Sequence, residues 1–456
     1  MDNQLNQNTN EPTKTSKVYK KKDYKKAPLS SVHLRVYLAL ILGQISCGYA
    51  LGISGTALSQ AADYINISDF WTGLIGAGSL IGLAGSSLMG RIADQFGRRG
   101  MLMINMYLFT IISLLQLVTT NLPLLFVERV LIGLMIAIDY TVGNSLLVEW
   151  LPANSGGKFQ SQLIVYWTIG FVASYIAGIT ITGFGSYNWQ VIIASSAVPG
   201  LITALYRSIF HLPASPSWLA SQGKNKTAQK VIQKHLGKKW GLSLKMIKSK
   251  PVDNISWTTL FSKQYRRRTL VGGLFYACQA FAFFGISIFL PILLESMGLG
   301  ESAASGIIYN GCVFIGVLFG SWIFNRISRR AFLISSFFLS ALALTILCLS
   351  NQASPIWQIA VFAFFAIILS AGLTLDYPYP TELFDIKVRA TGVGTCITIS
   401  RFGAASGTFL LPIFTHLGGA SLSMIICTVV LIIGGLICLI WAPETSPKFM
   451  KKGSGK

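Results

Sequence analysis

Two aspartates stand inside long apolar stretches of the sequence, where a charge is costly. Asp139 lies ten residues before Glu149, and Asp376 lies six residues before Glu382. On helices these offsets place the aspartates about 15 Å and about 9 Å deeper than the glutamates. A charge at mid-membrane costs about 2.5–3.5 kcal/mol on insertion scales, and burial favours the neutral carboxyl group. We therefore expect Asp139, Asp376 or both to bind substrate and carry a coupling proton; a structural hydrogen bond or a permanent pair with an arginine is the alternative.

Two arginines also fall within apolar stretches. Arg401 lies about eight residues into its stretch, and its guanidinium offers two parallel hydrogen bonds to a carboxylate. We expect it to bind substrate, with an internal ion pair to Asp376 or Glu382 as the alternative. Arg129 directly follows Glu128 and is expected to form a structural ion pair near the outer surface of the membrane.

Further polar and aromatic side chains in the apolar stretches are candidates for the lining of a substrate cavity. Amides in the middle of a membrane span need partners, although interhelical packing is the alternative for each residue. The candidates are Gln44, Tyr49, Tyr140, Asn144, Gln162, Tyr166, Gln279, Phe283, Phe284 and Tyr377.

The composition indicates a membrane protein. Of the 456 residues 52% are apolar and only 12% are charged, with a mean hydropathy of +0.58. Soluble proteins carry about 25% charged residues, so a soluble enzyme of two or three domains is not expected. The seven cysteines have no paired spacing and the four histidines are scattered. Neither a disulfide framework nor a metal site is predicted, and no cofactor is expected.

Twelve stretches are long enough to cross a bilayer, since about 20 apolar residues span the hydrocarbon core as a helix. They are 36–60, 73–92, 101–120, 123–148, 160–182, 189–212, 269–294, 304–325, 331–350, 355–383, 393–415 and 419–441. The predicted fold class is therefore an all-α membrane protein of twelve transmembrane helices in two pseudo-symmetric six-helix bundles. Its predicted parts are a disordered basic tail (1–35), an N-terminal bundle (36–212), a basic linker (213–268), a C-terminal bundle (269–441) and a second tail (442–456).

The formal net charge of +21 follows the predicted topology. Of the 37 Lys and Arg, 35 fall in tails and loops on one side of the membrane, which leaves only Arg129 and Arg401 within spans. Basic residues concentrate in cytoplasmic loops. Both termini are therefore predicted to be cytoplasmic in an inner (plasma) membrane. The charge indicates orientation in the lipid bilayer, with tail lysines near anionic headgroups, and no nucleic-acid partner is expected.

An internal repeat relates the two sets of spans. Residues 90–99 are GRIADQFGRR and residues 321–330 are SWIFNRISRR, an offset of 231. Glu149 and Glu382 are 233 residues apart. Two matches at nearly the same offset indicate duplicated bundles, and parallel repeats with a binding site at their interface are a transporter architecture.

The first copy of this repeat resembles the G-x-x-x-D-x-x-G-R-R signature of the major facilitator superfamily. The matching residues are Gly90, Asp94, Gly97, Arg98 and Arg99. The glycines permit close helix approach and a tight turn, and in that family this loop locks the cytoplasmic gate. The resemblance implies a gate that also includes Glu149, Arg326, Arg330, Glu382 and Arg389.

Other motifs resemble the sugar-porter and organic-ion branches of this superfamily, the latter including metabolite–proton symporters. Residues 212–219, LPASPSWL, are similar to the sugar-porter P-E-S-P-R-W-L, and residues 443–445 match P-E-T. The run 381–401 is more similar to the organic-ion branch, where an arginine at the position of Arg401 contributes to substrate recognition. Sugar–proton symporters carry a coupling aspartate where this chain has Ala50, and their span-seven sugar motif is missing.

These features together predict a secondary active transporter that works by alternating access and takes up a small organic acid with protons. The alternatives are a sugar or polyol porter, efflux of a drug or metabolite, and a nutrient sensor that has lost transport. No nucleotide-binding motif and no nucleophile–base pair is present, so an enzyme is not expected. The protein is expected to act as a monomer on a small-molecule substrate.

Overall fold

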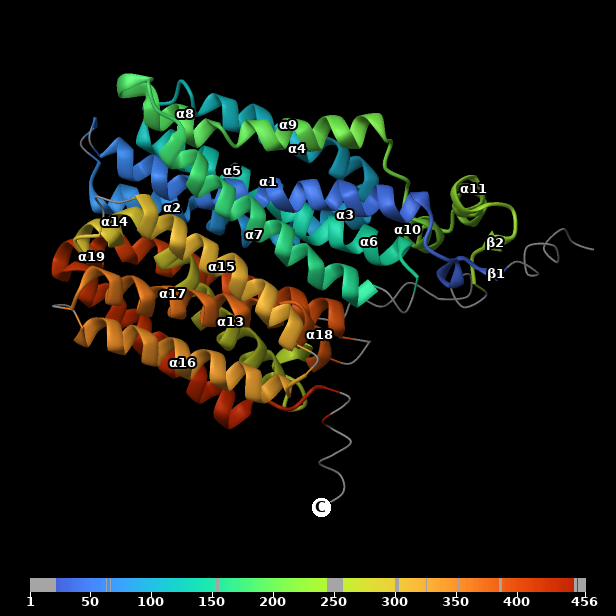
Figure 1. Cartoon of the computed structure of the whole chain (residues 1–456). Coiled ribbons are helices and arrows are strands. Elements are labelled where there is room, and N and C mark those ends of the chain that lie inside the picture. Colours follow the sequence, from blue (N-terminus) through green and yellow to red (C-terminus); the bar gives the residue numbers. More distant parts are fainter. Residues whose placement is uncertain are drawn as a thin grey trace, which may run out of the picture.

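The computed structural model describes residues 22–446 and 449, apart from 63, 66, 153–155, 244–256, 300–302, 325, 351–352 and 385–387. Over these residues the chain is almost entirely helical. The helices form two bundles that lie side by side, with residues of the first half (blue to green) above and those of the second half (yellow to red) below (Figure 1).

The N-terminal bundle contains six spans, three of them built from more than one helical segment. Its elements are α1 (Ser31–Ala61), α2 (Asp69–Leu83), α3 (Ser86–Phe96), α4 (Arg98–Leu115), α5 (Leu122–Ile138), the π-helix η2 (Asp139–Gly143), α6 (Asn144–Trp150), α7 (Gly156–Thr180), the 3-10 helix η3 (Gly185–Tyr187), α8 (Asn188–Ala194) and α9 (Ala197–Ile209). The polar residues Ser68 and Asn121 start α2 and α5, because each side chain accepts a hydrogen bond from a backbone amide of the first turn.

The C-terminal bundle has the same plan. Its elements are η4 (Trp257–Phe261), α13 (Arg266–Ile288), α14 (Leu290–Ser296), α15 (Ala303–Ile323), α16 (Arg329–Leu349), α17 (Pro355–Gly372), η5 (Leu373–Leu375), α18 (Pro378–Leu383) and α19 (Arg389–Trp441). A kink at Gly418 and Gly419, the latter with φ +66°, divides α19 into two spans.

The count of spans confirms the predicted fold class. Nine helical segments among the described residues are long and apolar enough to cross a membrane. The kinked α19 supplies two spans instead of one. The short α4, which begins with two arginines, and the stretch α5–η2–α6, which the π-helix interrupts, complete the twelve.

Parts of the predicted tail and linker are folded, contrary to the prediction of a disordered segment to residue 35. Strand β1 (Lys22–Asp23) pairs in parallel with β2 (Trp240–Gly241), next to η1 (Tyr24–Lys26), α10 (Pro216–Ser221) and α11 (Asn225–Leu236). The Tyr24 hydroxyl donates to the Glu149 carbonyl at 3.0 Å, and Lys25 Nζ donates to the carbonyls of Val148 at 2.5 Å and Leu151 at 3.3 Å. The segment is ordered because it buries Tyr24 and caps the end of α6, a contact between distant residues that local composition does not reveal.

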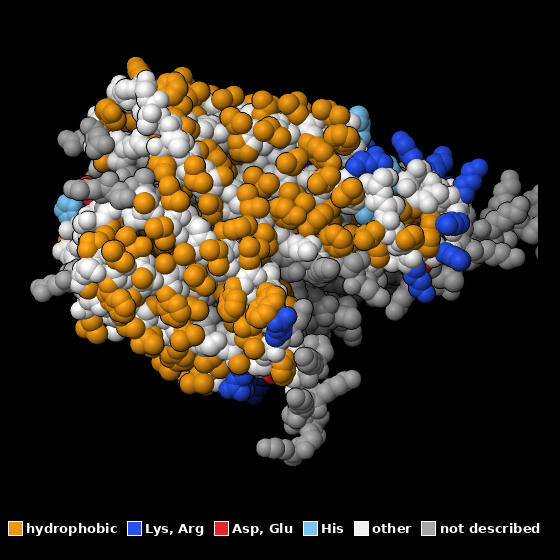
Figure 2. All heavy atoms as spheres, in the orientation of Figure 1, with side chains coloured by type: hydrophobic (Ala, Val, Ile, Leu, Met, Phe, Trp, Pro, Cys, Tyr) orange, Lys and Arg blue, Asp and Glu red, His pale blue; other side chains and the backbone are white. Residues whose placement is uncertain are grey.

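The surface is divided between charge at one end and apolar side chains along both bundles. Lysine and arginine side chains gather around α10 and α11, whereas hydrophobic side chains cover the visible sides of the bundles (Figure 2). Exposed apolar residues of this number are unfavourable in water and typical of a surface in contact with lipid. We call the end that holds Arg98, Glu149, Arg329 and Glu382 the basic end.

Candidate functional site

Arg401, on α19, lies where the two bundles meet. Its side chain is buried, and Nη2 donates to the Tyr276 hydroxyl at 3.0 Å. Its Cζ lies 5.5 Å from the ring centroid of Tyr276 and 5.8 Å from that of Tyr140, a cation–π arrangement. Since Tyr276 belongs to α13 and Tyr140 to η2, the guanidinium is held between rings from both bundles. Its Nε is buried without a hydrogen-bond partner.

Asp376 lies beside this group, at the end of η5. The span is broken here because Pro378 and Pro380 cannot donate helical hydrogen bonds. Asp376 is buried, and Gln279 of α13, with its amide oriented to satisfy both ends, donates to Oδ1 at 3.0 Å and accepts from Leu373 N at 3.0 Å. Among the residues that the structure describes, Asp376 forms no ion pair with Arg401.

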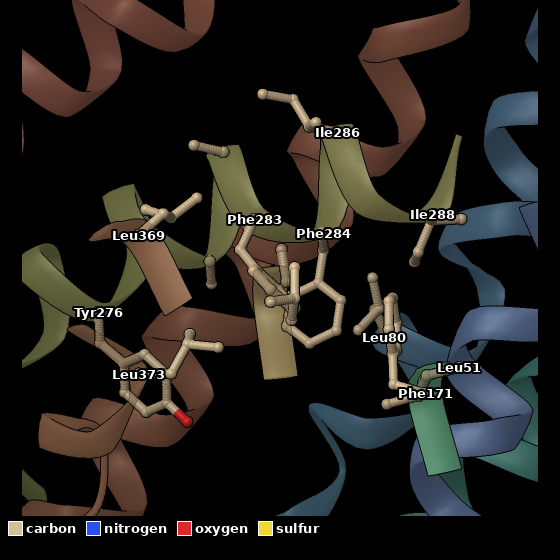
Figure 3. Packing of buried hydrophobic residues seen from close by; sticks show 14 of the residues in the cluster. Leu51, Leu80, Phe171, Tyr276, Phe283, Phe284, Ile286, Ile288, Leu369 and Leu373 are labelled. Atoms are coloured by element: carbon tan, nitrogen blue, oxygen red, sulfur yellow. The ribbon is translucent and has the colours of Figure 1, made fainter. Parts of the chain in front are cut away.

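An aromatic cluster continues the site between the bundles. The Trp167 ring of α7 lies 6.1 Å from both Phe283 and Phe284 of α13, and Phe171 lies 5.7 Å from Phe283. Figure 3 shows these two phenylalanines between Tyr276 and Leu373 on one side and Leu51, Leu80 and Phe171 on the other. The structure thus places Phe283 and Phe284 between the bundles, whereas the described contacts of Gln279 lie within the C-terminal bundle, beside Asp376.

Asp139 has different surroundings. Both of its oxygens accept from Arg207, at 2.5 Å from Nη2 and 3.1 Å from Nη1, and Asn105 Nδ2 donates at 2.6 Å. Asp139 and Arg207 are 0% exposed, inside the N-terminal bundle. The count of Arg207 among the loop charges was therefore wrong. Arg207 stands within the predicted span 189–212, so the reasoning that singled out Arg401, a basic residue within an apolar stretch, applied to it equally. Asn105, in the predicted span 101–120, was missed, although the signal that selected the amides of Asn144 and Gln279 applied to it equally.

Of the remaining cavity candidates, Tyr377 neighbours Arg401, whereas the described contacts of Tyr49, Gln162, Tyr166 and Asn144 lie elsewhere. The Tyr49 hydroxyl is 2.8 Å from the Ser195 hydroxyl, the Tyr37 hydroxyl donates to Gln162 at 3.3 Å, and the ring of Tyr166 lies 6.3 Å from that of Tyr37. These contacts lie within the N-terminal bundle. Asn144 donates to the Tyr140 carbonyl at 2.8 Å, one turn back along its own span. Gln44 is buried on α1, and Tyr377 is half-buried next to Asp376.

The prediction for Arg129 was also wrong. The side chain is 0% exposed, and its Nη2 donates to the Ala50 carbonyl at 2.9 Å. Glu128 instead accepts from the Thr119 hydroxyl at 2.7 Å. Neighbouring residues on a helix point about 100° apart, so the adjacent acid does not face the arginine.

At the basic end, two of the predicted gate residues of the N-terminal bundle form an ion pair. Arg98 Nε lies 2.8 Å from Glu149 Oε1, and the Ser215 hydroxyl donates to Glu149 Oε2. Gly97 ends α3 and precedes α4 with φ +92°, and a Cβ there would lie 2.9 Å from the Trp218 ring. This position of the signature therefore requires glycine both for its backbone angle and for its close contact.

The C-terminal bundle repeats this arrangement with one residue that was not predicted. Arg329, and not Arg326 or Arg330, pairs with Glu382, at 3.5 Å, and Thr445 Oγ1 donates to Glu382 at 2.5 Å. The repeat thus relates Arg98 to Arg329, Glu149 to Glu382 and Ser215 to Thr445. The correspondence of Arg98 and Arg329 was already present in the sequence, because the repeat offset of 231 residues aligns position 98 with position 329.

The P-E-T motif also caps a helix. Glu444 accepts from the backbone amides of Arg329 at 3.1 Å and Arg330 at 3.2 Å, at the start of α16. Burial alone would raise the pKa of Glu444, but hydrogen bonds from the amides of Ser446, Arg330 and Arg329 outweigh it and lower that pKa. The residue before α4, the equivalent helix of the N-terminal bundle, is Gly97, which has no side chain to cap it.

The other predicted gate residues have separate contacts. Arg326 stacks on the Trp322 ring at 3.6 Å, Arg330 donates to the Leu439 carbonyl at 2.8 Å, and Arg99 is exposed. A Cβ on Gly90 would meet nothing within 4 Å, so the close approach expected there is not observed. The side chains of Asp94 and Arg389 lie outside the described residues. Both observed ion pairs lie within one bundle each and do not by themselves join the bundles.

The two bundles are in close contact at the end opposite the basic end. A Cβ on Gly55 would lie 1.5 Å from the Ile288 carbonyl oxygen, and one on Gly73 would lie 2.2 Å from that of Phe409. Small residues allow such backbone approach between membrane helices.

Comparison with known proteins agrees with this architecture. The family model described as sugar (and other) transporter matches residues 6–453. The inner membrane metabolite transport protein YgcS of Escherichia coli (strain K12) is 31% identical over 420 residues, which are 92% of this chain and 93% of the relative. A second metabolite transport protein of that strain, YaaU, is 31% identical over 421 residues, 91% of this chain and 93% of the relative.

A solved structure has the same fold. The xylose transporter XylE from E. coli, in a partially occluded inward open conformation, superposes with a TM-score of 0.76 at 18% identity, covering 91% of this chain and 99% of XylE. The relatives are transporters and not enzymes, and sugar porters need no cofactor. The chain belongs to the sugar (and other) transporter family of the major facilitator superfamily and is a multi-pass membrane transporter.

Proposed function

We propose that this transporter is a proton-coupled symporter that takes up a small organic acid by alternating access. It acts as a monomer in an inner (plasma) membrane, with its basic end and both termini in the cytoplasm, an orientation supported by the distribution of Lys and Arg. The observation that carries the substrate class is Arg401, a buried guanidinium between tyrosine rings of the two bundles with Nε unpartnered.

A carboxylate bound to Arg401 would touch both bundles. Tyr140 comes from the N-terminal bundle and Tyr276 from the C-terminal bundle, and both face the guanidinium. A ligand shifts the inward and outward populations only if it contacts the two states differently. A site shared by both bundles meets this condition, because rocking of one bundle changes the distance between its two halves.

Asp376 is the proposed carrier of the coupling proton. It is buried, its partner is the Gln279 amide and not a cation, and it neighbours Arg401. Protonation of Asp376 removes a negative charge next to the substrate carboxylate, which links proton binding to substrate binding. Asp139 is less suited to this role, because it is held in a buried ion pair with Arg207 inside the N-terminal bundle.

Uptake into proteoliposomes tests both roles. With an acid exterior, the wild type should accumulate a radiolabelled monocarboxylate from a panel that also contains pentoses, hexoses and polyols. Arg401→Gln should lower kcat/KM for the acid about 100-fold, since losing a buried charge–carboxylate contact costs about 2–5 kcal/mol. Asp376→Asn should retain exchange of labelled for unlabelled acid but lose accumulation driven by the pH gradient.

Tyr276→Phe is the matched control, because it removes only one hydrogen bond from Arg401 and should reduce uptake much less than Arg401→Gln. Accumulation of a sugar or polyol in place of every acid would contradict the substrate class. Ligand binding without flux in any condition would favour a sensor, and gradient-driven accumulation by Asp376→Asn would refute the role of Asp376.

A further inference from the structure

Arg129 is a buried cation that the site around Arg401 does not use. Its Nη2 donates to the Ala50 carbonyl at 2.9 Å, but Nε and Nη1 are buried without hydrogen-bond partners. Among the described residues it forms no ion pair. Its side chain is packed closely against α2, where Gly78 has no side chain and a Cβ would lie 2.8 Å from that of Arg129.

The surroundings of Arg129 differ from those of the other two buried arginines, Arg207 and Arg401. Arg207 is neutralised by Asp139, and Arg401 neighbours Asp376. Arg129 has no such acid in the part of the chain that the structure describes. A buried guanidinium without a counter-ion is strongly unfavourable, because desolvation is not repaid by a nearby negative charge.

Arg129 also lies on the same face of its span as Tyr140, which contacts Arg401 in the proposed substrate site. It precedes Tyr140 by 11 residues, and at about 100° per residue the two side chains leave the span within about 20° of each other. The rise over this distance is about 16 Å, toward the end where the bundles are in contact. The face of this span that meets Arg401 through Tyr140 therefore carries a second, unpaired cation further from the basic end.

We propose that Arg129 binds a small monovalent anion, which is either chloride or the carboxylate of the transported acid. Nε and Nη1, which have no hydrogen-bond partner among the described residues, leave N–H donors of a fixed positive charge for such an anion to accept from. The carboxylate case rests on the proposed function, since it makes Arg129 an outer contact of the same substrate. The chloride case does not depend on it.

Thermal unfolding of the purified protein in detergent tests the proposal without transport. Sodium gluconate is replaced stepwise by sodium chloride, or by sodium acetate, at constant ionic strength. A ligand that binds only the folded state raises the midpoint in a saturable way, and we expect a rise of about 2–4 °C. A response to chloride indicates a chloride site, and a response to acetate alone indicates a carboxylate site.

Variants separate Arg129 from the other cations. Arg129→Gln should abolish the response, and Arg401→Gln should retain it. Ala50→Asp introduces a carboxylate on the residue whose backbone carbonyl accepts from Arg129. It should abolish the response and leave the midpoint in gluconate at least as high as in the wild type. Ala50→Asn is the matched control and should respond. A wild type that responds to neither anion, or an equal response in Ala50→Asp and the wild type, would overturn the proposal even if Arg401 binds the transported acid.

Discussion

Asp139→Asn should destabilise the protein strongly, because it removes one half of a buried ion pair. In the structure the carboxylate accepts from Arg207 at 2.5 Å and 3.1 Å and from Asn105 at 2.6 Å, with both charged side chains 0% exposed. The variant leaves the guanidinium buried without its counter-ion, which costs about 3–5 kcal/mol. Asp376→Asn removes no ion pair among the described residues and should cost about 1 kcal/mol or less.

The double variant Asp139→Asn with Arg207→Met identifies the cause. Removing both charges leaves nothing uncompensated, so most of the lost stability should return, with a coupling free energy of about 2–3 kcal/mol. The free energy of unfolding in detergent, induced by denaturant or by heating, is measured for the wild type, the two single variants and the double variant. Additive losses, or a loss for Asp139→Asn no larger than for Asp376→Asn, would refute this reasoning. A folded double variant without proton-coupled uptake would show that Asp139 takes part in coupling after all.

Two further predictions concern the basic end. Ala214→Glu should raise the free energy of unfolding by about 0.5–2 kcal/mol, because position 214 corresponds to Glu444, which caps α16, whereas the residue before α4 is Gly97, which has no side chain. An unchanged thermal midpoint relative to Ala214→Gln would contradict this. Burial lowers the pKa of Lys25 from 10.5 to about 8. Between about pH 8 and pH 10.5 the folded state therefore binds fewer protons than the unfolded state. Docking of residues 22–27 should become more stable as the pH rises through this range and should not change with pH below it. Hydrogen exchange of that segment, corrected for intrinsic rates, measures the effect, and Lys25→Met should abolish it.

The number and approximate position of the spans could be predicted because each span depends on its own run of apolar residues. A run of about 20 apolar residues has few stable conformations in lipid other than a helix, and this holds whatever the neighbouring spans are. The ends of the spans were less predictable. The π-helix at Asp139–Gly143 interrupts the stretch 123–148, which was predicted as one span, whereas the kink at Gly418 and Gly419 lies at the predicted break between 393–415 and 419–441.

The ion pairs at the basic end were predictable only in part. Arg98 and Glu149 were both expected among the gate residues, and the structure pairs them with each other. Arg329 takes the equivalent place in the second bundle, but three basic residues stand within five positions there and composition cannot select among them. The tertiary structure selects Arg329, because the side chain of this first residue of α16 reaches Glu382.

The sequence by itself determined that charges at Asp139, Asp376, Arg129 and Arg401 are significant, because the cost of a charge in lipid depends only on its place within an apolar run. Only the tertiary structure decided what each charge does. Partners come from helices distant in sequence, so it is packing that gives Asp139 its counter-ion Arg207 and leaves Arg401 between the tyrosines of two bundles. The same packing leaves Arg129 with two unpartnered nitrogens.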